Sequence, residues 1–181
     1  MTAGQLVSVP GLWDGFTHPL LGADHLLALV SVGIVSALLG PQAIWTLPAS
    51  FVASMALAGI VGLNGIALPR SELWIAISLV ALGLTISTCG AMGLTGRRIP
   101  TWLAGIFVVT FGAAHGNAHG LEMPATASPA AFTVGFLAGT AGLHFAGVAA
   151  GLSSLRHRAS AFVLRMAGAF TAATGVGLLT R

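Results

Sequence analysis

Histidines and carboxylates gather in two short segments of this 181-residue chain. The first segment, residues 14–25, reads DGFTHPLLGADH, and the second, residues 115–122, reads HGNAHGLE. Imidazole nitrogens mixed with a few carboxylates suit nickel, cobalt, zinc or copper, whereas magnesium and calcium prefer oxygen ligands alone. We therefore predict a transition-metal site whose ligands are drawn from His18, Asp24, His25, His115, His119 and Glu122.

The spacing within each segment predicts that its ligands share a helix face. His18 and His25 are seven residues apart, nearly two helical turns, and they share a face if the helix begins near Pro19, a favoured first-turn residue. The histidines and the glutamate of HGNAHGLE follow an i, i+4, i+7 pattern, which stacks them along one stripe. Two glycines in the same segment weaken the helix, so we expect local unwinding around Gly116.

Polar side chains elsewhere in the apolar runs are candidates for supporting roles. His144 lies in the middle of one run, where ionisable groups are functional candidates by default, so we assign it as a deeper relay ligand. Asp14, Asn64 and Asn117 are candidates for hydrogen-bonding the metal ligands. Ordinary hydrogen bonds between helices are the alternative for the two asparagines.

Long apolar helices must position these residues. The chain is 56% hydrophobic and only 6% charged, whereas about a quarter of the residues in a soluble domain are charged. No apolar run has the polar alternation of a barrel strand. Each run approaches the roughly 20 residues that a spanning helix needs. We predict an all-α polytopic membrane protein, a single transmembrane domain over residues 1–181 forming a compact bundle of six transmembrane helices, at residues 20–39, 45–67, 73–94, 101–119, 130–152 and 161–179.

The arginines orient this predicted bundle. Arg97 with Arg98, and Arg156 with Arg158, lie in the connections after the third and the fifth spans. Positively charged connections stay in the cytoplasm, so both termini are expected on the outer, periplasmic side. The first span then begins, and the fourth span ends, at the outer face. The two metal-binding segments are therefore expected on the same side of the membrane.

Composition also excludes several classes of function. The seven basic residues are all arginines, scattered in ones and twos, and they form no patch for nucleic acid. The sequence has no phosphate-binding loop, so we expect no nucleotide site in this chain. Cys89 is the only cysteine, which rules out an intrachain disulfide and a multi-cysteine zinc site. The first residues lack the pattern of a secretory signal, so the first span is expected to direct insertion.

The stretches HPLLGADHLLA, at residues 18–28, and HGNAHGLEMP, at residues 115–124, resemble the HupE/UreJ family. WTLPASFVASMALAG at residues 45–59, the spacing of the six spans and the stretch around His144 are similar to it too. The resemblance implies uptake of nickel, in places cobalt, across the inner membrane of a bacterium to support hydrogenase or urease maturation. It also implies that the matched histidine, aspartate and glutamate positions contact the metal. Leu29 stands where many members have methionine, so no thioether ligand is expected there.

Two rival functions would use the same histidines. A membrane metalloenzyme is the first, but Gly116 replaces the catalytic glutamate of the H-E-x-x-H motif. A b-type haem protein is the second, and the clustered carboxylates favour a hydrated cation over haem iron. We therefore expect a secondary permease or channel-like protein without enzymatic activity or a catalytic cofactor. Its partners are the lipid bilayer and a Ni²⁺ cargo, with Co²⁺ or Zn²⁺ as alternatives, and a homo-oligomer remains open.

Overall fold

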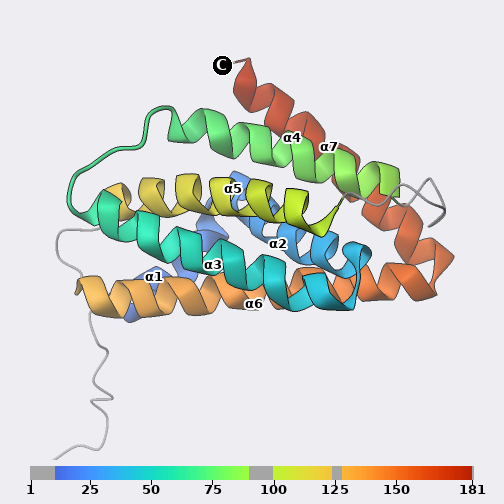
Figure 1. Ribbon diagram of the computed structural model, residues 1–181, viewed down its shortest axis with the longest axis horizontal. Helices are drawn as coiled ribbons and strands as arrows, with labels where there is room; N and C mark the ends of the chain where they lie inside the picture. The colour runs from blue at the N-terminus through green and yellow to red at the C-terminus, as the bar shows by residue number, and fades with distance from the viewer. Residues whose placement is uncertain (1–10, 90–99, 124–127, 181) are drawn as a thin grey trace, which may run out of the picture.

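The computed structural model describes residues 11–89, 100–123 and 128–180, and its regular structure in these ranges is entirely helical. Seven helices follow one another there, and Figure 1 shows them packed side by side as a bundle. Their bounds are α1 (Leu12–Leu21), α2 (Ala23–Leu39), α3 (Pro41–Leu63), α4 (Ser71–Cys89), α5 (Thr101–Glu122), α6 (Pro129–Arg156) and α7 (Arg158–Leu179).

Four of these helices, α3, α4, α6 and α7, are long and apolar enough to cross a membrane. The α1–α2 pair passes the same test as one unit, although it is bent by 87° at its break. Helix α5 has 22 residues but is not one of these candidate spans. The histidines and the asparagine near its C-terminal end lower its mean hydropathy. The prediction of an all-helical fold is confirmed, while the count of six spans and the outer placement of both termini stay predictions. Residues 90–94 of the third predicted span, and Arg97 with Arg98, lie outside the described residues.

The beginning of the predicted first span lies at a break between two helices. Helix α2 covers residues 23–39 of that span, whereas residues 20 and 21 belong to α1. Gly22 separates α1 from α2 in an extended conformation, with φ −91° and ψ 116°, and Pro19 lies inside α1 instead of at a helix start. A methyl group on Gly22 would lie 2.8 Å from Nδ1 of His25, so glycine leaves room for the side chain that follows the turn. The prediction that His18 and His25 share one helix face is wrong, because the 87° bend separates them.

Faces lined with glycine bring the helices into close contact. Helix α5 packs along α3, α6 packs along both α1 and α2, and α4 packs along α7. A methyl group on Gly116 would lie 2.6 Å from Cα of Met55, and one on Gly120 would lie 3.0 Å from the backbone nitrogen of Leu63. Small residues thus let backbones approach, as helices in lipid require. The expected unwinding around Gly116 is wrong: α5 is unbroken, and its glycines serve close packing against α3.

The bundle exposes many large apolar side chains, and its mainly apolar interior also holds several polar groups. More than half of the surface of Leu57, Val134, Phe145 and Phe162 is exposed. These side chains suit contact with lipid tails. Polar groups are costly at membrane depth, so those in the interior are candidates for a function. The buried polar side chains include His25, His115, Asn117, His119, Thr140 and His144.

Candidate metal centre

The bend between α1 and α2 directs two histidines against the C-terminal half of α5. His18 comes from α1, His25 from the first turn of α2, and His119 from the last turns of α5. Nε2 of His18 lies 2.8 Å from Nδ1 of His119, although the two residues are 101 positions apart in the chain. The structure therefore brings together the two segments that the sequence analysis placed on one side of the membrane.

Three of the predicted ligands form an outer triad: His18, His119 and Glu122. Oε2 of Glu122 lies 3.5 Å from Nε2 of His18 and 3.5 Å from Nδ1 of His119, and the three atoms all lie within 4.8 Å of one another. Two ligands bound tetrahedrally to one ion at 2.0 to 2.2 Å stand about 3.3 to 3.6 Å apart. The two distances to the carboxylate already match this spacing, and the two imidazoles need to separate by less than about 1 Å.

Two further histidines, His25 and His115, form an inner pair. Nδ1 of His25 lies 3.1 Å from Oδ1 of Asp24, and Nδ1 of His115 lies 2.8 Å from the carbonyl oxygen of Phe111. Both acceptors hold a proton on Nδ1, which leaves the lone pair of Nε2 free to bind a metal. Neither Nε2 atom has a hydrogen-bond partner among the described residues, and both are buried. The two rings stand nearly perpendicular, with centroids 5.1 Å apart.

His119 connects the triad to the inner pair. Its ring centroid lies 4.2 Å from that of His25, and its side chain is only 5% exposed, whereas that of Glu122 is 51% exposed. Solvent therefore reaches the carboxylate of the triad, and burial increases through His119 to His115, which is 1% exposed. The donors form a row that runs from the surface into the bundle.

The electrostatics of the centre favour a dication. Glu122 lies beyond the predicted span, and hydrogen bonding from the His119 imidazole holds the pKa of this carboxyl below its ordinary value. The glutamate is therefore negatively charged at neutral pH. With neutral imidazoles, the carboxylates of Asp24 and Glu122 together carry two negative charges, which balance one divalent cation.

Asp24 makes its contacts to the neighbouring histidine. Its Oδ1 accepts a hydrogen bond of 3.0 Å from the backbone N–H of His25 in addition to the contact with the imidazole. Such a carboxylate orients a metal-binding histidine and fixes which ring nitrogen carries the proton. The structure therefore places five of the six predicted ligand side chains in the row. The sixth, Asp24, contacts His25 through its carboxylate.

The predicted supporting residues lie elsewhere. Asn117 is fully buried, and its side chain binds the backbone of the α3–α4 connection, accepting from the N–H of Leu68 at 2.7 Å and donating to the carbonyl of Ile66 at 2.8 Å. Asn64 donates to the carbonyl of Ile60 in its own helix. Asp14 lies in the exposed first turn of α1. In the parts of the chain that the structure describes, no hydrogen bond joins these three side chains to the four histidines of the row.

Two phenylalanines of α6 support the triad, and the sequence analysis did not identify them. The ring of Phe132 lies 5.5 Å from that of His18, and the ring of Phe136 lies 4.5 Å from that of His119, centroid to centroid. Their spacing of four residues was the available signal, but it indicates only a buried helix face. These rings limit the positions that the two imidazoles can adopt.

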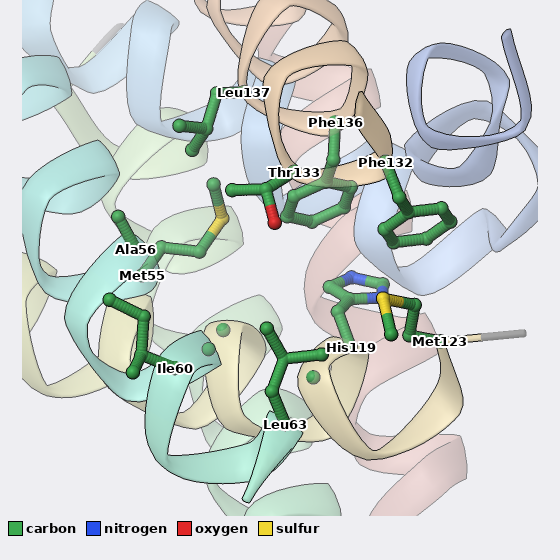
Figure 2. A pocket seen from close by; sticks show the side chains of 13 residues that line it. Met55, Ala56, Ile60, Leu63, His119, Met123, Phe132, Thr133, Phe136 and Leu137 are labelled. Carbon is green, nitrogen blue, oxygen red and sulfur yellow. The ribbon is translucent and has the colours of Figure 1, made fainter. Parts of the chain in front are cut away.

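A small cavity of about 40 Å³ adjoins His119 between α3, α5 and α6. Figure 2 shows Met55, His119, Met123 and Phe136 around it. The lining is mainly apolar, with two thioether sulfurs and the hydroxyl of Thr133 as further polar or polarisable groups. The volume suffices for at least one water molecule, so a ligand that is not protein has room beside His119.

Comparison with known proteins extends the resemblance of the two motifs to nearly the whole chain. The family described as HupE / UreJ protein matches residues 2–178. Protein HupE of Rhizobium leguminosarum bv. viciae is 40% identical over 170 residues, which cover 93% of this chain and 84% of the relative. No solved structure matches at a significant level.

Proposed function

Because the chain belongs to the HupE/UreJ family, we propose that it is a membrane permease for a divalent transition-metal ion. The preferred cargo is Ni²⁺, with Co²⁺ next, and the ion is used in the maturation of a metalloenzyme such as hydrogenase or urease. The proposed location is the inner membrane of a bacterium, with uptake towards the cytoplasm. The proposed role is transport, without a catalytic step or a catalytic cofactor.

The observation that carries this proposal is the convergence of His18, His119 and Glu122. Two imidazole nitrogens and a carboxylate oxygen within 4.8 Å of one another match the ligand preference of nickel, cobalt and zinc. The choice of nickel among these metals rests on the family alone. The partly exposed carboxylate would receive the hydrated ion, and the imidazoles would then replace some of its water.

The graded burial of the donors supports transport more than storage. A structural metal site is closed and fully coordinated by protein, whereas here the donors extend from the exposed Glu122 to the buried His115. Incomplete coordination at each position lets an ion leave as well as bind. The membrane potential draws a dication inwards by about 4.6 kcal/mol per 100 mV, so no nucleotide is needed for accumulation.

The close contact between His18 and His119 favours a small ion over the haem alternative. Axial haem ligation needs the iron and its macrocycle between two histidines. In this structure the imidazoles of His18 and His119 lie within hydrogen-bond distance, with a carboxylate beside them. This arrangement supports a small hydrated cation as the ligand.

The proposal is tested by uptake of radiolabelled nickel into bacterial cells that lack other nickel and cobalt transporters. His119→Gln removes one donor of the triad, and we expect uptake to fall at least about tenfold, since losing even a supporting partner of a metal ligand costs that much. His157→Gln is the matched control, because His157 is an exposed histidine between α6 and α7. Equal uptake by wild type and His119→Gln, at equal protein abundance in the membrane, would refute the proposed function.

A further inference from the structure

His144 is a buried histidine for which the fold provides no hydrogen-bond partner. It lies in the middle of α6 and is 2% exposed, and neither of its ring nitrogens has a partner among the described residues. A buried polar group without a partner is costly, so one in a native fold requires an explanation. For a titratable residue deep in a membrane bundle, an ion pathway is a common one.

Thr140 lies one helical turn before His144 and has the same unusual property. It is fully buried, and its Oγ1 has no hydrogen-bond partner in the described parts of the chain. Threonines in helices usually donate to the carbonyl four residues earlier, as Thr171 and Thr174 do in α7. Residues four apart are neighbours on one face, so α6 places an imidazole and a free hydroxyl side by side.

The ring of Phe51 from α3 lies between His144 and the inner pair. Its centroid is 5.5 Å from that of His115 and 5.3 Å from that of His144, and Phe51 is fully buried. The row of donors that starts at Glu122 therefore continues beyond one aromatic ring to another nitrogen donor. An apolar constriction of this kind excludes water, and with it hydrated ions, until a side chain or a helix moves.

We propose that His144 and Thr140 form a second resting site for the transported dication, which we name the transit site, on the far side of Phe51 from His25 and His115. This inference rests on the proposed function. The transit site offers one imidazole nitrogen and one hydroxyl oxygen, so the ion must keep water or take backbone oxygen as its remaining ligands. Such sparse coordination suits a brief stay before release.

The transit site is tested by separating nickel binding from nickel uptake. His144→Gln keeps a polar side chain of similar length but removes the imidazole. We expect the purified full-length variant to bind Ni²⁺ with the affinity of the wild type, because the outer triad and the inner pair are both intact, while cellular uptake falls on the order of tenfold. Thr140→Val, which keeps the shape and removes the hydroxyl, should lower uptake by a smaller factor. His157→Gln should change neither quantity.

A structural role for His144 predicts a different pattern, so two smaller variants complete the test. His144→Cys supplies a thiolate ligand, whereas His144→Ala supplies none, and both leave space beside Phe51. If the transit site exists, uptake by His144→Cys exceeds uptake by His144→Ala at equal abundance. Equal uptake by these two variants, or wild-type uptake by His144→Gln, would overturn the inference. The proposed function survives that result provided that His119→Gln still lowers uptake at least about tenfold.

Discussion

Replacing Asp24 by asparagine tests whether this carboxylate acts by orienting His25. Oδ1 of Asp24 lies 3.0 Å from the backbone nitrogen of His25 and 3.1 Å from its Nδ1. Loss of a partner that orients a metal-binding histidine lowers metal affinity by 10- to 100-fold, about 1.4 to 2.8 kcal/mol. Asparagine keeps an acceptor oxygen but loses the charge, so we expect the lower end of this range, about tenfold weaker nickel binding.

Titration calorimetry of the purified chain with NiCl₂ measures this change in affinity. Glu72→Gln is the matched control, because it removes one negative charge from the exposed first turn of α4. X-ray absorption of the nickel-loaded Asp24→Asn variant should show the same number of nitrogen and oxygen ligands as the wild type. Wild-type affinity in Asp24→Asn would refute the orienting role, and the loss of one oxygen ligand would show that Asp24 binds the metal directly.

Two further predictions concern helix packing and pH. Gly116→Ala puts a methyl group against the backbone of Met55 and should destabilise the protein by about 1 to 3 kcal/mol. Gly105→Ala on the same helix is the control, because its methyl group meets nothing within 4 Å. Equal thermal midpoints for the two variants in detergent would contradict the α3–α5 contact. Nickel affinity should fall as the pH is lowered, because protons compete with nickel for the imidazole nitrogens. The low pKa of Glu122 keeps this carboxylate ionised as the pH begins to fall, so an affinity that rises as the pH is lowered would argue against histidine ligands.

Hydropathy and arginine placement were sufficient to predict much of this architecture. Runs of apolar residues with almost no charge and no polar alternation favour helices as the bilayer structure. The helix bounds agree with the predicted runs to within a few residues, apart from the end of the third run, which lies outside the described residues. The placement of arginines indicated that two distant segments share a membrane face. The 2.8 Å contact of His18 with His119 agrees with that inference.

The predicted helix start near Pro19 was wrong because the local signals are ambiguous. Pro19 is compatible with the first turn of a helix and also with its interior in a bent segment, and Gly22 interrupts the helix where its lack of a side chain makes room for His25. The glycines of α5 also allow two interpretations, a weakened helix or a closely packed one. Glycine weakens a helix in isolation, but Gly116 instead allows α3 to approach, which depends on a tertiary contact that one sequence does not specify.

The division of the histidines into an outer triad and an inner pair was also beyond the sequence. It depends on which ring nitrogen meets an acceptor, and for His115 that acceptor is the backbone carbonyl of Phe111. The position of Phe51 between His115 and His144 comes from a third helix, α3. Residue types predicted the chemistry of the site, whereas the order of the donors from the surface inwards required the packing.

One metal ion is expected to bind where the two distant segments meet, and anomalous diffraction at the nickel edge from nickel-loaded crystals tests this most directly. A peak about 2.0 to 2.2 Å from Nε2 of His18 and Nδ1 of His119 is the predicted result. Such a peak would also lie within coordination distance of the Glu122 carboxylate. A nickel peak bound by neither histidine, in crystals of protein that is active in uptake, would contradict the account.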